Sequence, residues 1–190
     1  MGYLIIGLGN IGAEYVDTRH NIGFMVLDQL AALQKTSFVT DKLGMVATCE
    51  YQGCTLYLLK PTTYMNLSGR SVCHWLGHTR IHVIHSLVIV DDVALPFGKL
   101  RMKARGSAAG HNGLKNIEAF LGTQAYPRLR MGIGSNFPKG RRADYVLAPF
   151  TAEEQKALPA SMAQACQMIL SFCASGIGPT MERYNNLTPQ

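Results

Sequence analysis

Residues 7–21 are Gly7-Leu8-Gly9-Asn10-Ile11-Gly12-Ala13-Glu14-Tyr15-Val16-Asp17-Thr18-Arg19-His20-Asn21. The run before them, 3–6, is apolar without interruption, which is typical of a strand buried on both faces. The segment after them, 22–33, has apolar residues at positions 26, 27, 30 and 33 and so favours a helix with one buried face. A strand, a polar connection and a helix predict an α/β fold. The polar side chains of the connection indicate a functional site at the end of the strand.

Part of this connection, Gly7 to Gly12, matches the G-x-G-x-x-G pattern of dinucleotide-binding turns. In such a turn the third glycine belongs to a helix that starts at once, and an acidic residue about 20 positions on ends a second strand. Here several residues separate Gly12 from the predicted helix, and the acidic residue at that distance, Asp28, lies inside it. A nicotinamide cofactor is therefore the weaker alternative, and a titration with the cofactor tests it.

The stronger interpretation starts from His20, because an imidazole can take up and return a proton near neutral pH. A single histidine is more often structural or on the surface, and we interpret His74, His78, His82 and His85 in that way. His20 differs from them in the polar residues that surround it.

A second unbroken apolar run, 86–90, is followed by Asp91 and Asp92. Sites in open α/β sheets lie beyond the carboxyl ends of the strands, so His20 and Asp91 are expected to meet there despite their separation in sequence. The alternative is that both carboxylates are solvated in a loop.

The remaining strand patterns predict a mixed sheet. Two β-rich runs, 44–51 and 54–59, flank a short polar turn and predict an antiparallel hairpin. Alternating basic and apolar residues predict a strand over 98–103 with one basic face, and 128–134 predicts another strand. We expect one domain, residues 1–190, in the α/β class, with a central twisted sheet of parallel and antiparallel strands flanked by helices.

Two later helices carry start signals. Asn112 is expected to cap a helix over 113–121. Thr151 and Glu154 form a capping-box pair that opens the last helix, which Pro159 is expected to kink or split.

The composition excludes several classes of protein. Hydrophobic residues make up 47% and charged residues 16%, as in a folded globular chain rather than a disordered one. The formal net charge of +6 favours a polyanionic partner. Five cysteines, an odd number without metal-ligand spacing, indicate reduced thiols. No apolar run approaches the roughly 18 residues of a membrane span, and no signal peptide pattern is present, so we expect a cytoplasmic protein.

Five sequence blocks together resemble the bacterial peptidyl-tRNA hydrolases. They occur in the expected order and lie between residues 5 and 150, so the combination is much more specific than any single block. The blocks are Gly-Leu-Gly-Asn…Tyr…Thr-Arg-His-Asn within 7–21, Lys-Pro-Thr-Thr-Tyr-Met-Asn-Leu-Ser-Gly at 60–69, Val-Asp-Asp-Val-Ala-Leu-Pro-Phe-Gly at 90–98, Gly-Ser-Ala-Ala-Gly-His-Asn-Gly-Leu-Lys at 106–115, and Arg-Leu-Arg-Met-Gly-Ile-Gly at 128–134.

The resemblance implies hydrolysis of the ester between a peptide and the terminal ribose of tRNA, which releases peptide and free tRNA. Such a reaction needs an activated water, stabilisation of an oxyanion and a means of holding the substrate. By this resemblance His20 would deprotonate the water, and Asp91, selected over Asp92 by its distance from Pro96, would fix the tautomer of His20. Asn10 is the third catalytic candidate, because a neutral amide can donate and accept hydrogen bonds at once.

The resemblance also implies residues that bind the substrate. Lys103 and Arg130 correspond to positions associated with the 5′-phosphate of tRNA, and both side chain types suit phosphate. The alternative is that they are solvated charges on strands. The other substrate-binding candidates are Tyr15, Tyr64, Asn66 and Asn112.

No nucleophile motif or metal-ligand motif is present, so we expect direct attack by water without a metal, a cofactor or a covalent intermediate. We also expect a monomer without an obligatory protein partner and without membrane attachment. Two residues depart from the family pattern: Ile11 replaces a usual proline, and Ala94 replaces a common acidic residue. The non-enzymatic alternative is an RNA-binding module that has lost the chemistry, although every matched catalytic position is intact. Gly106 to Gly110 has little side chain to pack, so we expect its backbone to be mobile or to be approached closely by a ligand.

Overall fold

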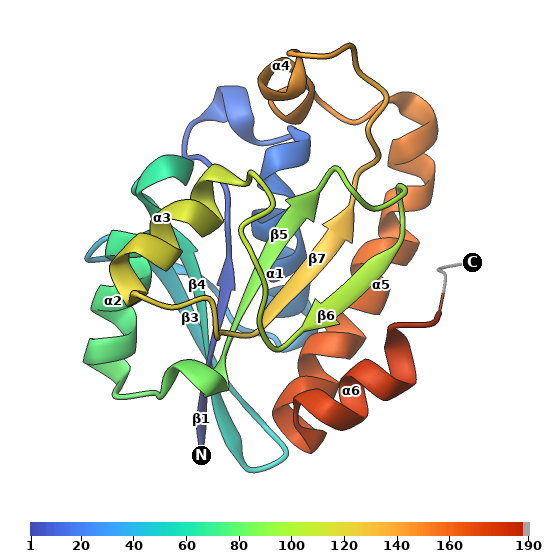
Figure 1. Ribbon diagram of the computed structural model, residues 1–190. Helices are drawn as coiled ribbons and strands as arrows, with labels where there is room; N and C mark the ends of the chain where they lie inside the picture. The colour runs from blue at the N-terminus through green and yellow to red at the C-terminus, as the bar shows by residue number, and fades with distance from the viewer. Residues whose placement is uncertain (188–190) are drawn as a thin grey trace.

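A seven-stranded sheet forms the centre of the computed structural model, which describes residues 1–187 (Figure 1). The strand order across the sheet is β2-β3-β4-β1-β5-β7-β6. The strands are β1 Gly2–Gly7, β2 Val39–Asp41, β3 Gly44–Tyr51, β4 Cys54–Pro61, β5 Ser86–Asp92, β6 Leu100–Lys103 and β7 Arg128–Gly132.

The sheet is mixed, as the sequence predicted. Strand β1 lies parallel to both β4 and β5, and β5 lies parallel to β7. The pairs β2·β3, β3·β4 and β6·β7 are antiparallel. The predicted hairpin turn is present, and both of its central residues, Gln52 and Gly53, have positive φ (47° and 78°), as a two-residue turn of the primed type requires.

Helices cover both faces of this sheet (Figure 1). Helices α1 and α5 lie on one face, and α2 and α3 lie on the other. The helices are α1 Ile22–Leu33, α2 Ser68–Thr79, α3 Asn112–Leu121, α4 Arg142–Val146, α5 Ala152–Ser175 and α6 Ile177–Tyr184, with 3-10 turns η1 Ala13–Tyr15, η2 Arg19–Asn21, η3 Met65–Leu67 and η4 Val83–His85.

The two-sided packing explains why the central strands are apolar without alternation. In β1, Ile5 belongs to the core on the α1 and α5 side, whereas Leu4 and Ile6 belong to the core on the α2 and α3 side. In β5, Leu87 and Val88 divide between the two cores in the same way. The middle of such a strand is apolar because neither face meets water.

The structure shows that the dinucleotide-binding interpretation is wrong. Gly12 leads into the 3-10 turn η1, and α1 begins only at Ile22. Asp28 lies on α1, where it forms an ion pair with Lys60, so it does not end a second strand. The turn therefore lacks the helix N-terminus that would meet a pyrophosphate.

The predicted cap of α3 is wrong, and the predicted split of the last helix at Pro159 is absent. The N-cap of α3 is His111, whose side chain accepts from the backbone N–H groups of Gly113 and Leu114, and Asn112 is instead the first helical residue. Helix α5 continues without interruption past Pro159, so the proline does not split it. The predicted capping box of Thr151 and Glu154 is confirmed.

Helix α5 is the one described helix that is long and apolar enough to cross a membrane by length and composition alone. Its residues Ala165, Ile169 and Phe172 are buried in the core beneath the sheet, and its neighbours are α1 and α6. A core helix of a globular domain meets the same criteria, so we interpret α5 as a core helix.

Candidate active site

Helix α1 docks closely on the ends of β1 and β5 and so positions the residues before it. A Cβ atom at Gly23 would lie 2.4 Å from the Leu8 nitrogen and 2.7 Å from the Ile89 carbonyl oxygen. Only glycine allows this approach, because both neighbours are backbone atoms. The approach places η2, with His20, over the end of β5, where Asp91 lies.

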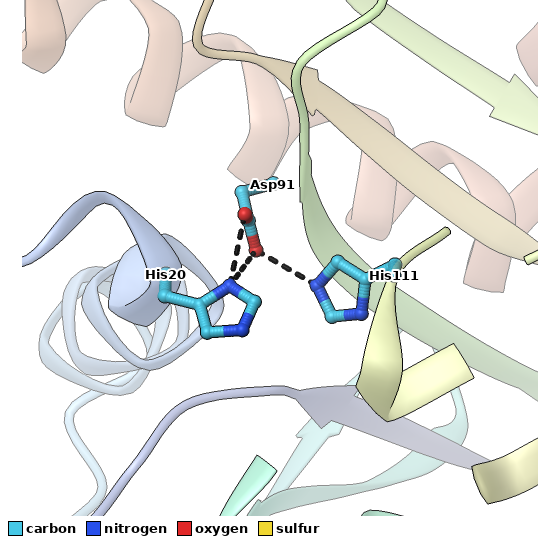
Figure 2. Close-up of side chains that lie close together, drawn as sticks. All are labelled: His20, Asp91 and His111. Carbon is cyan, nitrogen blue, oxygen red and sulfur yellow. Dashed lines mark hydrogen bonds and ion pairs between the residues drawn. The ribbon is translucent and has the colours of Figure 1, made fainter. Parts of the chain in front are cut away.

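His20, Asp91 and His111 form one buried hydrogen-bonded cluster (Figure 2). The Nδ1 atom of His20 lies 3.0 Å from Oδ1 and 2.9 Å from Oδ2 of Asp91. The Nε2 atom of His111 lies 2.9 Å from Oδ1 of the same carboxylate. Figure 2 shows Asp91 between the two rings, with the second nitrogen of His20 turned away from the carboxylate. The expected meeting of His20 and Asp91 is therefore present.

The carboxylate of Asp91 stays ionised in this cluster. Burial alone would raise its pKa, but the imidazoles of His111 and His20, whose N–H groups face the carboxylate, outweigh that effect and hold the pKa well below its usual range. An ionised carboxylate only accepts hydrogen bonds, so both ring nitrogens that face Asp91 must carry protons.

The two histidines have different capacities for proton transfer. Nδ1 of His111 accepts from Gly113 N–H at 3.1 Å and from Leu114 N–H at 3.4 Å, so this nitrogen is unprotonated and the ring is neutral. Its lone pair is committed to the N-terminus of α3. His20 has no such second bond among the described residues, and its Nε2 is the nitrogen that remains available as a base.

Asn10 is held in a defined orientation by backbone contacts. Its Oδ1 accepts from Met65 N–H at 2.7 Å, so Nδ2 is the part of the amide that can donate to a ligand. Its backbone N–H and carbonyl both bond to the side chain of Asn21, at 2.8 and 2.9 Å. These bonds tie the end of β1, η2 and η3 together around one point.

A cavity of about 440 Å³ opens beside this cluster. Its size is within the range of small-molecule sites. Four of the predicted site residues do not line it: Tyr15, Tyr64, Lys103 and Arg130. The residues that line it are Asn10, His20, Met65, Asn66, Asp91, Gly110, His111, Asn112, Arg142, Ala143, Val146 and Leu147.

Comparison with known proteins identifies the family. The family model described as peptidyl-tRNA hydrolase matches residues 4–190. The chain belongs to the peptidyl-tRNA hydrolase family. A peptidyl-tRNA hydrolase of Phocaeicola vulgatus is 55% identical over 97% of this chain and 99% of its own length. One of Porphyromonas gingivalis is 51% identical over 97% of this chain and its whole length.

A solved structure shows that the fold is that of the family as well. The crystal structure of peptidyl-tRNA hydrolase from Acinetobacter baumannii superposes with a TM-score of 0.93 at 32% identity, covering 99% of this chain and 96% of that chain. The resemblance seen in the five sequence blocks is thus confirmed, and the chain is a hydrolase of the peptidyl-tRNA hydrolase family.

Two of the predicted residues outside the cavity lie on neighbouring strands of the sheet. Lys103 is exposed at the end of β6, and Arg130 lies on β7 with Nη1 3.7 Å from Oδ2 of Asp92. Asp92 also accepts from the backbone N–H of Ala94 at 2.8 Å. Tyr64 is half exposed and has φ 63° and ψ 159°, a strained combination for a residue with a side chain.

The glycine- and alanine-rich segment 106–110 is held by arginine side chains. Arg128, which is fully buried, donates to the carbonyls of Gly106 and Ser107 at 2.8 and 3.2 Å. Arg130 also donates to the Ser107 carbonyl, and Arg142 donates to the Ala109 carbonyl at 3.1 Å. These bonds fix the segment that leads into His111.

Sequence reasoning missed His111. Its residue type and its place beside Asn112, in a block shared with the family, were visible signals. They did not show that the ring turns back to Asp91, because that depends on the path of the segment before it.

The same three side chains could hold a metal ion. One ligand atom from each of His20, Asp91 and His111 lies within 4.8 Å of the others. A metal ion at this point would displace the protons of two hydrogen bonds that are already well formed, at 2.9 Å each. The donors and acceptors that face one another around Asp91 are already paired, so these groups need no ion to satisfy them.

Proposed function

We propose that this chain hydrolyses the ester bond between the peptide and the tRNA of peptidyl-tRNA, with a water molecule activated by His20. The observation that carries the proposal is the buried contact of His20 Nδ1 with an ionised Asp91, which leaves Nε2 as the available base beside the cavity. Family membership supports the substrate class.

In this mechanism Asp91 has two tasks. It accepts a hydrogen bond from Nδ1–H, which keeps Nε2 unprotonated, and it stabilises the imidazolium that forms when Nε2 removes a proton from water. His111 acts as a positioning residue, because it donates to Asp91 while its other nitrogen caps α3. The proton taken up by His20 is then returned to the ribose oxygen as the ester bond breaks.

Amide groups are the candidates for holding the substrate and its oxyanion. Nδ2 of Asn10 is oriented as a donor by the bond from Met65 N–H to Oδ1. Asn66 and Asn112 line the same cavity and are proposed to bind the peptide or the terminal ribose. Neutral amides suit this role because they stabilise negative charge without attracting free anions.

The tRNA is proposed to contact residues outside the cavity as well. Lys103 and Arg130 are assigned to the 5′-phosphate near the acceptor end, and Tyr15 and Tyr64 to further substrate contacts. The exposure of Lys103 and the half exposure of Tyr64 support these assignments. We further propose that the reaction uses no metal and no cofactor, and that the protein acts as a monomer without an obligatory partner. We also propose that it is cytoplasmic, and the five free cysteines support a reducing compartment.

The test is peptide release from an N-acylated aminoacyl-tRNA by the wild type and by His20→Ala. We expect the substitution to abolish hydrolysis, since no other described imidazole lines the cavity with a free lone pair. It should leave the affinity for tRNA and the spectroscopic signature of the folded protein nearly unchanged. Unblocked aminoacyl-tRNA is the control substrate. His78→Ala, at an exposed position on α2, is the control variant and should keep full activity. Wild-type turnover by His20→Ala would refute the assignment of the base.

A further inference from the structure

Arg142 is the one lysine or arginine among the described residues that line the cavity. The cavity contains one anion, Asp91, which is already bonded to two imidazoles. Arg142 comes from the start of α4, and the catalytic cluster comes from η2, β5 and the residue before α3. The cavity therefore combines a satisfied catalytic cluster with a separate, unneutralised cation.

The position of the guanidinium is fixed by the facing loop. Nη2 of Arg142 donates to the Ala109 carbonyl at 3.1 Å. A Cβ atom at Gly110 would lie 2.6 Å from Nη1, so the guanidinium packs directly against a residue without a side chain. Gly110 also has φ 78°, a conformation that favours glycine. The loop is thus shaped to receive this guanidinium beside the cavity.

Most of the hydrogen-bonding capacity of Arg142 is unused. A guanidinium has five N–H donors, and the Ala109 carbonyl takes one of them. No carboxylate within residues 1–187 lies at ion-pair distance from Arg142, whereas the neighbouring Arg141 pairs with Asp144 at 2.9 Å. Arginine binds phosphate through two parallel N–H groups, and this arrangement leaves such a fork available.

We propose that Arg142 forms a subsite for a phosphodiester of the substrate, namely the one that joins the last two nucleotides of the tRNA. The inference rests on the proposed function and names a contact within the same cavity. The peptide varies among substrates, but this phosphodiester is present in every peptidyl-tRNA and lies one ribose away from the scissile ester. It is the fixed anion nearest the reacting bond.

This subsite is separate from the proposed 5′-phosphate contact. Lys103 and Arg130 lie on β6 and β7 outside the cavity, and Arg130 bonds to Ser107, two residues before the carbonyl that Arg142 contacts. One loop therefore lies between two arginines that would meet different phosphates. The subsite places the 3′ end, whereas the pair on the strands places the acceptor stem.

The experiment is a double-mutant cycle on peptidyl-tRNA. One change is Arg142→Gln, and the other replaces the terminal phosphodiester of the tRNA by an uncharged methylphosphonate. We expect each change alone to lower kcat/KM by about tenfold, mainly through KM, because a charge-assisted contact is lost. The two changes together should lower it no further than one alone. Arg142→Lys should retain part of the phosphate preference.

Matched controls distinguish a phosphate contact from a purely structural role of Arg142. Arg141→Gln removes the same charge from a side chain that is 69% exposed and should leave kcat/KM unchanged with both substrates. When the methylphosphonate is moved one linkage inward, the terminal phosphodiester keeps its charge. Arg142→Gln should then lower kcat/KM as it does with the unmodified substrate. Multiplicative losses in the cycle would show that Arg142 only holds the loop and would overturn the subsite. Failure of the wild type to release peptide from the unmodified substrate would instead refute the proposed function.

Discussion

Asp91→Asn tests the proton pathway, because it changes one charge and almost no volume. The new side chain has one oxygen and one NH2 group where the carboxylate had two acceptors. His111 must keep donating from Nε2, since its Nδ1 is committed to the N–H groups of α3. The amide oxygen is therefore expected to face His111, and the NH2 group to face His20.

This orientation reverses the tautomer of His20. An NH2 group at the Oδ2 position would lie 2.9 Å from Nδ1 and compete with the amide oxygen, which is 3.0 Å away. It favours the tautomer in which Nδ1 accepts, which moves the ring proton to Nε2 and removes the base. The opposite amide orientation leaves buried donors facing each other, at a cost of about 1–3 kcal/mol, or roughly 5- to 150-fold in rate. The loss of the charge that stabilises the imidazolium adds to this cost, so we expect the chemical step to fall by about 10²–10⁴.

The assay is single-turnover release of peptide from peptidyl-tRNA at saturating enzyme, with tRNA affinity measured separately. Asp92→Asn is the matched control. The Asp92 carboxylate accepts from Ala94 N–H, a bond that an amide oxygen can keep, and its ion pair with Arg130 is long at 3.7 Å. We expect a loss of roughly tenfold or less for this control. Equal losses for the two variants, or an Asp91→Asn rate within tenfold of the wild type, would refute the tautomer argument.

Three further predictions concern the tRNA contacts, the packing of α1 and a buried thiol. Lys103→Ala and Arg130→Ala should each weaken tRNA binding and lower the slope of log affinity against log salt concentration by about one unit. The affinity of both variants should also increase less than that of the wild type when the tRNA carries its 5′-phosphate. Titrations at several salt concentrations measure both effects. Unchanged slopes would leave both residues without a role in binding. Gly23→Ala should lower the free energy of unfolding, measured in urea, by about 3 kcal/mol or more, because the new Cβ would collide with backbone atoms. The control is Gly77→Ala on α2, where a Cβ meets nothing within 4 Å. This control should raise the free energy of unfolding by about 0.5–1 kcal/mol. A stable Gly23→Ala protein would contradict the close docking of α1. Burial raises the pKa of the Cys166 thiol from 9.0 to about 11, so above pH 9 the unfolded chain loses this proton before the folded chain does. The free energy of unfolding is therefore unaffected by this thiol below pH 9 and falls by about 1.4 kcal/mol per pH unit as the pH rises towards 11. In Cys166→Ala the dependence of the free energy of unfolding on pH in this alkaline range should be smaller by the equivalent of about one proton, as denaturation curves at several pH values would show. An identical dependence would show that burial does not raise the pKa of this thiol.

Much of the fold could be predicted from the sequence because its central strands are buried on both faces. Such strands are short unbroken apolar runs, and polar residues mark their ends sharply. The helix over 22–33 matches α1 at both ends, since its apolar spacing begins where the polar connection stops. The pairing of His20 with Asp91 followed from the rule that strand ends in an α/β sheet share one edge.

Other parts of the site depend on three-dimensional features that leave no periodic pattern in the sequence. Arg128 occupies a strand position that is fully buried, although a basic residue in an alternating strand is ordinarily assigned to the solvent face. Its donors are satisfied by loop carbonyls rather than by a carboxylate. No charge pairing in the sequence could therefore have indicated its burial.

The placement of His111 follows from the same loop. Gly106, Ala109 and Gly110 all have positive φ, and these turns direct the chain so that the next residue caps α3 and meets Asp91. Alanine at φ 50° is unfavourable by itself, so the surrounding bonds must hold it there. Arginines from β7 and α4 supply those bonds. The geometry of the Asp91 carboxylate thus depends on a buried side chain that does not touch it, and substitution of Arg128 should alter the site through the loop even where His20 and Asp91 are unchanged.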